Sequence, residues 1–514
     1  MSDDRGRATS RAVVRWAAAG AGVAAVVAGA GLGELIAAWL APRASPVAAV
    51  GGVLVDLAPA WAKDLAIALF GTADKIALLT GIALALAGVA AAAGLLQRAR
   101  PPWGAVLAAL LGGLGVAAAL SRENAGPFAA VPSIVAGVVA SAAVTWLAPR
   151  ADATPAPDAS GVSRRRVLIG GVGAAVAGAL AIAWAASLRA GESAVAAVRA
   201  GLRLPAAARR AEVPAAAELG IPGLAPVVTP NVDFYRIDTA LIVPELDPAD
   251  WRLRIHGMVE REVVITWGEL LALPLEESVT TLACVSNPVG GDLIGTAVWL
   301  GHPIRELLTR AVPLPEADMV LSRSHDGFTA GTPLEALTDG RDAILAVGMN
   351  GEPLPFEHGF PVRMVVPGLY GYVSATKWVV ELEVTRFDRA RAYWTDRGWS
   401  ERGPIKLQSR IDVPRAGEVP AGETVLAGVA WQQHVGIVGV EVQVDDGPWQ
   451  RADLATAISA DTWVQWSARV PLEAGGHVIR CRAVSAAGET QTRETAPPAP
   501  DGATGWHERR ITAV

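Results

Sequence analysis

The chain reads TLACVSNPVGG from Thr281 to Gly291, and this segment decides how the rest of the sequence is interpreted. Cys284 stands at the end of a predicted strand and enters a loop rich in Gly, Pro and Asn. A cysteine in that position projects its thiol from the sheet edge, where a thiolate would suit a soft metal ion. Two plainer interpretations stay open: a disulfide with Cys481, or a buried structural thiol.

A second run, from His358 to Trp378, is rich in groups that bind phosphate. It contains Arg363, Lys377, several hydroxyl side chains and glycine-rich turns. These groups could together cradle a phosphate. Taken singly, Arg363 and Lys377 could equally be solvated charges at strand ends, and His358 a satisfied loop histidine.

From about Asn231 the chain mixes strand and short-helix patterns without a regular βαβ repeat, which predicts an α+β domain. Thr266 stands three residues before Glu269, the spacing of a capping box that opens a short helix. A strand predicted at 343–347 runs into an Asn350-Gly351 turn.

From about Ser409 the pattern becomes all-β. Alternating runs at 440–444 and 477–484 are each followed by a turn, which predicts an immunoglobulin-like sandwich. Cys481 alternates with its neighbours so that it lies on the same face of the predicted strand as Ile479 and Ala483. We therefore expect Cys481 in the core of this sandwich.

The first two hundred residues consist mostly of Ala, Val, Leu and Gly, and the chain of 514 residues has a positive mean hydropathy of +0.35. An apolar run of about 20 residues spans a membrane as a helix. The segment 46–70 is also apolar but carries Asp56, Lys63 and Asp64, so we interpret it as interfacial, with a re-entrant hairpin as the alternative. Five other segments predict an all-α transmembrane bundle: Val14–Leu40, Lys75–Leu96, Trp103–Leu120, Phe128–Leu147 and Val167–Leu188.

Arginine placement predicts the orientation of this bundle. Arginines precede the first segment, separate the second from the third and precede the fifth. This arrangement predicts a multi-pass protein of the cell membrane, with its amino terminus in the cytoplasm and the residues after about 188 outside. The run SRRRVL at 163–168 resembles a twin-arginine export signal, which carries folded domains. In the alternative interpretation, these three arginines only mark the cytoplasmic side of the next helix.

The membrane half contains no His, no Cys and no internal Met, hence none of the usual side-chain ligands for haem or an iron–sulfur cluster. We therefore expect an anchor, and a separate electron carrier. A transporter is the alternative, but Glu34 is the main ionisable residue within the helices. The net charge of −6 argues against nucleic acid as the main partner.

Taken together, residues 231–514 resemble the sulfite oxidase family of molybdopterin enzymes in the order and spacing of several pieces. These pieces are Asn231–Tyr235, the Cys284 loop, Gly348–Pro355, His358–Arg363 and Lys377-Trp378, while residues 428–431 and 440–449 resemble the family's immunoglobulin-like dimerisation domain. The expected organisation is a transmembrane anchor at 1–188, a linker at 189–228, a molybdopterin domain at 229–400 and a sandwich at 401–514, the last implying a homodimer.

The resemblance implies a Mo-molybdopterin cofactor. Cys284 would be the thiolate ligand of the molybdenum, whose other sulfurs come from the pterin dithiolene. The metal would pass an oxygen atom to or from a small-molecule substrate. The resemblance implies that the pterin and its phosphate are held by Asn231, Phe234, Tyr235, His358, Arg363, Ser374, Ala375, Thr376 and Lys377, with Ser322 or Ser324 adding a contact.

Two departures from the family pattern bear on the substrate. Sulfite oxidases proper carry a tyrosine where this chain has Val347, and an Arg-Asn-His stretch where it has Pro230-Asn231-Val232. The Asn…Phe-Tyr pattern is closer to the periplasmic reductases of the family that repair methionine sulfoxide. Arg236 could supply positive charge for an anionic substrate. The alternative to an enzyme is a non-catalytic surface binding protein on the same fold.

Overall fold

The computed structural model describes residues 2–41, 44–57, 74–121, 126–148, 172–185, 194–240, 243–415 and 417–514. The chain divides into two compact units. One comprises Met1–Ala197 with Ala240–Ile242, and the other Val198–Thr239 with Val243–Val514.

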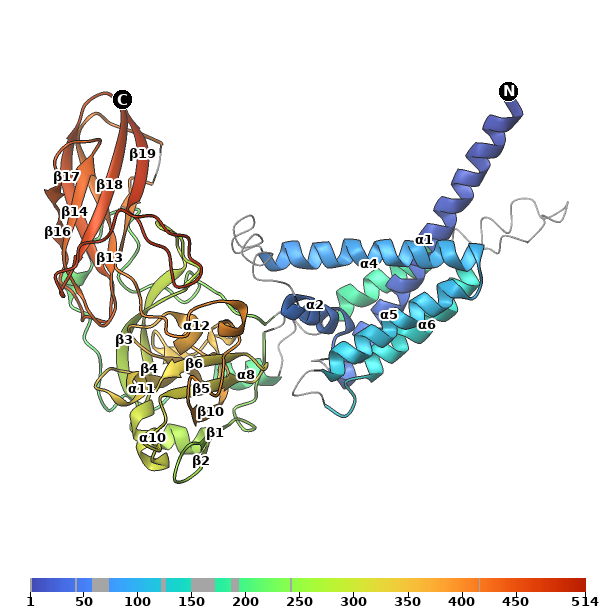
Figure 1. The fold of residues 1–514 in the computed structure, drawn as a ribbon, viewed down its shortest axis with the longest axis horizontal. Coiled ribbons are helices and arrows are strands. Elements are labelled where there is room, and N and C mark those ends of the chain that lie inside the picture. The colour runs from blue at the N-terminus through green and yellow to red at the C-terminus, as the bar shows by residue number, and fades with distance from the viewer. Residues whose placement is uncertain are drawn as a thin grey trace. The chain divides into compact units, whose positions relative to one another are not determined.

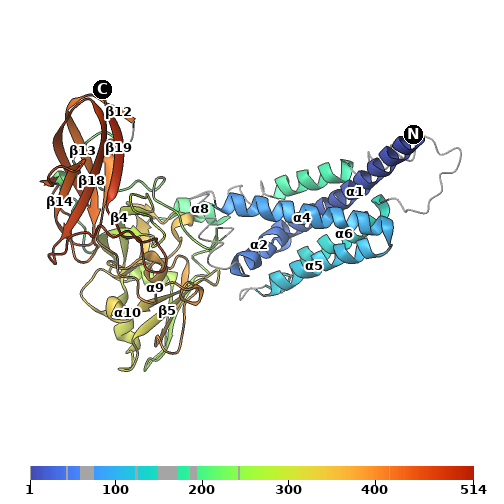
Figure 2. The ribbon, with the colours of Figure 1, turned by 45° about the horizontal axis from the view of Figure 1, so that its top comes forward.

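The first unit is helical. Figures 1 and 2 show α1, α4, α5 and α6 packed side by side. Small residues line these contacts: a Cβ added at Gly29 of α1 would lie 2.4 Å from the main-chain oxygen of Ala136 in α6. Close backbone approach of this kind is typical of packed apolar helices in membranes. The helices are α1 (Ser2–Leu40), α2 (Pro46–Leu57), α4 (Asp74–Ala99), α5 (Trp103–Leu120), α6 (Val131–Leu147) and one at 172–185.

Three helical stretches are long and apolar enough to cross a membrane: Val14–Leu40, Thr80–Ala99 and Trp103–Leu120. Val131–Leu147 and Val172–Ala185 are shorter apolar helices. Each of the five predicted segments therefore contains helix. The helix α1 begins at Ser2, twelve residues before the predicted start, and both ends of the fifth segment lie outside the described residues. Of the segment 46–70, α2 covers the first part; the remainder, and the arginine run at 163–168, lie outside the described residues.

Glu34 is a buried residue of α1 whose carboxylate has polar partners at the start of α2. Its carboxylate accepts hydrogen bonds from Ser45 Oγ at 2.8 Å and from the main-chain N–H of Val47 at 3.1 Å. Val47 lies in the first turn of α2, where N–H groups have no partner within the helix. Glu34 thus satisfies a helix start, which gives it a structural role.

The second unit begins with a mixed domain of two β-sheets and short helices, as an α+β fold requires. One sheet has the order β2-β1-β10-β5-β6, the other the order β3-β4-β7-β8 with β9 paired to β7. The strands are β1 (Arg252–Gly257), β2 (Val263–Thr266), β3 (Glu276–Ala283), β4 (Ile294–Pro303), β5 (Met319–Ser324), β6 (Thr329–Pro333), β7 (Ile344–Met349), β8 (Glu352–Pro353), β9 (Arg363–Val365) and β10 (Val379–Thr385). The α-helices are α8 (Ala194–Gly201), which begins before this unit, α9 (Trp267–Ala272), α10 (Ile304–Ala311), α11 (Glu335–Thr338) and α12 (Gly371–Ser374), and the 3-10 turns are Ala215–Ala217, Phe356–His358 and Thr395–Arg397.

Two local predictions are confirmed in this domain. Thr266 caps α9, since its hydroxyl accepts from the N–H of Glu269 while the Glu269 carboxylate accepts from the N–H of Thr266. Asn350 and Gly351 both have positive φ, 51° and 83°, and join β7 to β8. Two successive positive φ angles are typical of the tight turns that match the twist of a hairpin.

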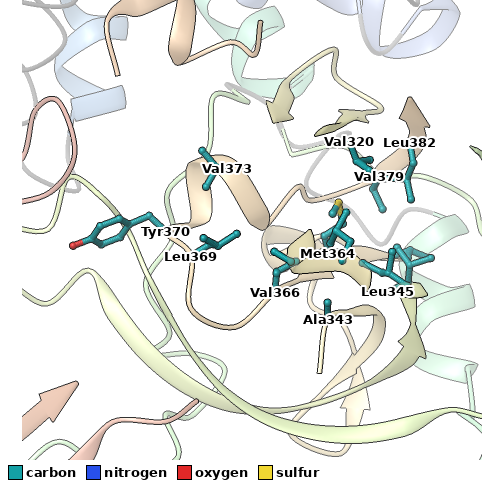
Figure 3. Packing of buried hydrophobic residues seen from close by; sticks show 14 of the residues in the cluster. Val320, Ala343, Leu345, Met364, Val366, Leu369, Tyr370, Val373, Val379 and Leu382 are labelled. Carbon is teal, nitrogen blue, oxygen red and sulfur yellow. The ribbon is translucent and has the colours of Figure 1, made fainter. Parts of the chain in front are cut away.

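One hydrophobic core joins the two sheets. Figure 3 shows Met364 of β9 among Leu345 of β7 and Val379 and Leu382 of β10, and all four side chains are fully buried. A close-packed core allows little displacement. The core therefore holds β9, and with it Arg363, in a fixed position.

Two further β-sheets, of orders β11-β13-β17-β16 and β12-β19-β18-β14-β15, pack face to face at the carboxyl end (Figure 1). The predicted runs at 440–444 and 477–484 fall in β14 and β18. Cys481, Ile479 and Ala483 are fully buried in the shared core, which confirms the predicted phase. The strands are β11 (Gln408–Val413), β12 (Gly417–Val419), β13 (Gly422–Trp431), β14 (Ile437–Val444), β15 (Gln450–Arg451), β16 (Asp453–Leu454), β17 (Val464–Leu472), β18 (Gly475–Ser485) and β19 (His507–Ala513).

The later part of the expected linker, residues 198–228, makes specific contacts. Arg199 donates to the main-chain oxygens of Leu354 at 2.7 Å and Pro353 at 2.6 Å. Glu218 accepts from Gln465 of the sandwich at 2.9 Å. The segment therefore lies along both parts of the second unit, which its Ala- and Pro-rich composition does not indicate.

Candidate functional site

Cys284 directly follows β3 and begins a closed loop to β4. Its N–H donates to the oxygen of Leu293 at 2.9 Å, and Asn287 Oδ1 accepts from the N–H of Leu293 at 3.0 Å. The Cys284 side chain is 8% exposed, and both it and Cys481 are free thiols. The structure therefore rules out the disulfide interpretation and places Cys284 at the end of a strand, as predicted.

The electrostatic surroundings of Cys284 act in two directions. Burial raises the pKa of its thiol, while hydrogen bonds from Ser286 and the charge of Lys377 lower it and offset part of that rise. The bare thiol is therefore protonated at neutral pH. A bound metal ion deprotonates a coordinating thiol, so this sulfur becomes a thiolate when a soft cation binds.

Arg363 is a buried cation that has no acidic partner among the residues that the structure describes. Its guanidinium donates to the main-chain oxygens of His358 at 3.2 Å and Ala375 at 3.4 Å, and it stacks over the ring of Trp299 at 4.9 Å. Burial lowers its pKa to about 10, and no carboxylate contributes to that pKa. A buried charge is costly unless it is paired, so this arginine is suited to an anionic ligand.

Lys377 lies in the same neighbourhood and shares one carboxylate with Arg236. Its Nζ is 3.0 Å from Asp238 Oδ2 and 2.8 Å from the oxygen of Glu357, and Arg236 Nε is 2.9 Å from the same Asp238 oxygen. Burial lowers the Lys377 pKa to about 8, against the opposing effect of Asp238. The single carboxylate of Asp238 thus faces the two cations Lys377 and Arg236, which leaves a net positive charge in this part of the site.

His358 has one buried ring nitrogen for which the described part of the chain supplies no hydrogen-bond partner. Its Nε2 is 3.2 Å from the oxygen of Asn231, whereas Nδ1 is buried and has no hydrogen bond. Burial, followed by the charges of Arg363 and Lys377, lowers the His358 pKa to about 3, so the ring is neutral. With a proton on Nε2, the free Nδ1 is an acceptor for an N–H of a ligand.

Aromatic rings form a further wall of the site. Phe234 stacks on Tyr235 with ring centroids 5.3 Å apart and meets Trp299 and His358 edge to face. Burial raises the pKa of Tyr235 far above its usual range; the neighbouring Cys284 adds to that rise, and the charge of Arg363 opposes it. Tyr235 is therefore a neighbour of both the cysteine and the arginine.

The predicted hydroxyl groups satisfy one another or the main chain. Ser374 Oγ donates to the oxygens of Leu369 and Tyr370 at 3.2 and 3.0 Å, and Ser322 Oγ is 2.7 Å from Thr376 Oγ1. Ala375 contributes its main-chain oxygen to Arg363. Ser324 Oγ accepts from Asp326 within its own hairpin, and its described contacts do not join it to the others.

Sequence reasoning missed several residues that fix this geometry. Asn350 donates to Asn231 Oδ1 at 2.8 Å, and Asn231 donates to Glu352 at 2.6 Å. Asp238 joins the two cations, as described above. Gly359 has a φ of 109°, and a Cβ there would lie 3.0 Å from Cβ of Arg363. Asn350 and Glu352 lie in the run Gly348–Pro355, and Gly359 lies in the run from His358 to Arg363, so these residues stood in segments that the sequence marked. Asp238 had no such signal.

The donor set fits a metal with a single protein ligand. Among the described residues no group of three or more His, Cys, Asp or Glu side chains could hold a metal ion. A metal at Cys284 would therefore take its other ligands from a cofactor. The unpaired Arg363 and the free Nδ1 of His358 suit an anionic cofactor that also carries N–H groups.

Comparison with known proteins identifies the domain that contains this site. Residues 240–394 match the model of the oxidoreductase molybdopterin binding domain. The sulfite oxidase of Gallus gallus is 31% identical over 320 residues, which cover 52% of this chain and 69% of that protein. The mitochondrial sulfite oxidase of Homo sapiens is 30% identical, over 52% of this chain and 58% of its own length.

Among solved structures, the sulfane dehydrogenase SoxCD from Paracoccus pantotrophus is similar over 56% of this chain and 84% of that chain. The sequence identity is 25% and the TM-score is 0.48.

Proposed function

The chain belongs to the sulfite oxidase family of molybdopterin-dependent oxidoreductases, and we propose that it transfers an oxygen atom to or from a small sulfur-containing substrate at a molybdenum held by Cys284. The observation that carries this proposal is the single free thiol at the end of β3, beside the unpaired buried Arg363. The cofactor is Mo-molybdopterin, which supplies the two-electron redox chemistry when bound, while the protein supplies position and electrostatics.

Each group has a distinct part in this account. Cys284 supplies a thiolate ligand to the metal. Arg363 and Lys377 bind the phosphate of the cofactor, because they are the cations left without full acidic compensation. His358 Nδ1 accepts a hydrogen bond from the pterin, and Tyr235, Phe234 and Asn231 close the wall of the site.

Arg236 is our candidate for recognising the substrate. Its side chain is 35% exposed, and its Nε lies 2.9 Å from Asp238 Oδ2. Val347, at the position of the tyrosine of sulfite oxidases proper, is fully buried in the core and offers no polar group. We therefore place recognition of an anionic substrate on Arg236 and leave both sulfite and a sulfoxide as substrates to be tested.

A steady-state assay tests the reaction. We expect the molybdenum-loaded chain to oxidise sulfite with an artificial acceptor or to reduce a sulfoxide with an artificial donor. Replacing Arg236 by glutamine should raise KM for anionic sulfite by about tenfold, since loss of one charged hydrogen bond costs roughly 1.5–3 kcal/mol. KM for a neutral sulfoxide should change little. A loaded chain that turns over neither substrate contradicts the proposal.

We also propose that the first unit anchors the protein in the cell membrane, with the amino terminus in the cytoplasm and the catalytic domain outside. The apolar helices and the arginine distribution support this orientation. Export of a folded domain explains a twin-arginine signal at 163–168, since a cytoplasmically inserted cofactor has to cross with its protein. The carboxyl-terminal sandwich is proposed as an immunoglobulin-like dimerisation domain, in a homodimer that receives or passes electrons through a separate carrier.

Cysteine labelling tests this orientation. The natural cysteines are both buried, so single cysteines introduced at Ser121 and at Arg100, both exposed, can be compared directly. We expect a membrane-impermeant maleimide to label Ser121→Cys in intact spheroplasts. Arg100→Cys should react only after the membrane is permeabilised. The opposite pattern refutes the orientation, and equal labelling of both without permeabilisation refutes the anchor.

A further inference from the structure

The sandwich domain contacts the later part of the Cys284 loop through Arg410 of β11. Arg410 Nη1 donates to the main-chain oxygen of Gly291 at 2.8 Å. Two other nitrogens of the same guanidinium hold Asp412, Nε at 2.6 Å and Nη2 at 3.2 Å. Both side chains are buried. A guanidinium fixed by a fork of this kind has a defined position, so it holds Gly291 in a defined position as well.

A second contact lies next to it in the loop. The ring of His507, the first residue of β19, packs on Gly290, so that a Cβ at Gly290 would lie 2.3 Å from ring atoms. Gly290 also has a φ of 76°, which favours glycine. The His507 ring is oriented by a hydrogen bond from the N–H of Ile411 to its Nδ1 at 2.9 Å.

The sandwich also contacts β3 before the cysteine. All three polar groups of Thr281 bind to it: the N–H donates to the oxygen of Asp461 at 3.0 Å, the hydroxyl accepts from the N–H of Trp463 at 2.8 Å, and the carbonyl accepts from Gln433 Nε2 at 3.1 Å. Cys284 therefore lies between two points that are both fixed by another domain.

We propose that the sandwich domain sets the position of the Cys284 sulfur, with Arg410 and His507 as positioning residues for the metal ligand. The inference rests on the proposed role of Cys284. The loop's own hydrogen bonds close its neck between Cys284 and Leu293. Within the loop, the N–H of Gly291 also donates to the oxygen of Pro288 at 2.9 Å. Gly290 and Gly291 have no side chains to pack, so the contacts of Arg410 and His507 add a constraint from the sandwich on this part of the loop. Outer groups that orient a ligand change the electronic properties of the metal.

The experiment uses the full chain, produced with an intact cofactor pathway. The variants are Gly290→Ala, His507→Asn and Arg410→Lys. Asparagine at 507 keeps an acceptor for the N–H of Ile411 but removes the ring. Lysine at 410 keeps the charge but cannot bind Asp412 and Gly291 through separate nitrogens. Arg469→Gln is the matched control. Arg469 is an exposed arginine of the same domain, and its ion pair with Glu423 lies on β17, away from the Cys284 loop.

Two measurements are made on each folded variant: the Mo(V) electron paramagnetic resonance spectrum, and the rate at which iodoacetamide alkylates Cys284 in the metal-free chain. We expect shifted spectra in all three variants. Alkylation of Cys284 should be about tenfold faster, because the loss of roughly one strong contact makes local opening of the Cys284 loop about tenfold more frequent. Arg469→Gln should match the unmodified chain in both measurements.

Unchanged spectra and unchanged alkylation rates in the folded variants would overturn the inference. Should Gly290→Ala fail to fold, the milder His507→Asn and Arg410→Lys decide the question. Cys284→Ser is measured alongside. If this variant leaves the molybdenum spectrum unchanged, the proposed metal ligand is wrong. If the spectrum changes in Cys284→Ser but in none of the three other variants, only the positioning role is refuted.

Discussion

Replacing Cys284 by serine is expected to reduce oxygen-atom transfer by more than about 100-fold, because even groups outside the first ligand shell of a metal cost about 10- to 100-fold when removed. Serine matches cysteine in shape, so the fold should persist with a Tm within a few degrees. Steady-state turnover and thermal unfolding of the same preparation check both statements.

Cys481→Ala is the matched control for that substitution. Cys481 is the other buried thiol, but it lies in the core of the sandwich, where its sulfur accepts a hydrogen bond from Ser409 at 3.2 Å. Its replacement should lower the Tm and leave turnover per molybdenum unchanged. Full activity in Cys284→Ser would contradict the assignment of the ligand.

Replacing Arg363 by methionine is expected to lower the amount of bound pterin by about 30-fold or more at limiting cofactor, since removing one partner of a buried charged contact costs roughly 2–5 kcal/mol. Methionine fills a similar volume, so the lost interaction is the charge. The pterin content of the purified protein, measured by fluorescence after oxidation, gives the result. Arg363→Lys should retain an intermediate amount, because it keeps the charge but not the fork.

Arg305→Met serves as the control for Arg363→Met. Arg305 also donates to a main-chain oxygen, that of Arg341 at 3.0 Å, but it lies on α10 outside the site. This variant should retain its pterin. Equal pterin in Arg363→Met and the unmodified chain would show that the buried guanidinium does not bind the cofactor.

We expect the binding of the pterin cofactor to depend on pH through Lys377. Its pKa is lowered to about 8 in the folded chain, so it is charged below that pH and loses its proton as the pH rises through it. An anion binds the charged form. Rebinding of the cofactor should therefore weaken above about pH 8, and Lys377→Met should abolish that change.

The sequence predicted the parts of the site that are local in the chain. Cys284 at the end of β3, the turn at Asn350-Gly351 and the capping box of Thr266 depend on neighbours within a few residues. Local patterns of this kind determine turns and helix starts directly. The structure places all three where the patterns predicted.

Contacts between distant segments could not be predicted in this way. Asp238 is shared by Arg236 and Lys377, and its role depends on the meeting of segments more than a hundred residues apart. The hydroxyl of Ser374 was expected to face the cofactor, but whether a serine hydroxyl turns to a ligand or to its own main chain is not encoded in the residue type. It donates to Leu369 and Tyr370.

The contribution of the sandwich domain was also missed. Arg410 and His507 are separated from Cys284 by more than a hundred residues, and neither lies in a segment that suggests metal chemistry. The only local sign is Gly290, whose positive φ and closeness to the His507 ring require a residue without a side chain. A glycine in a loop has many explanations, and the structure is needed to identify this one.

The most direct test of the central claim is X-ray absorption at the molybdenum edge, on the purified chain and on Cys284→Ser made with an intact cofactor pathway. We expect near-stoichiometric molybdenum with bound pterin, and one sulfur neighbour fewer around the metal in the serine variant. A chain that contains neither molybdenum nor pterin, or the same sulfur neighbours in both proteins, would contradict the account.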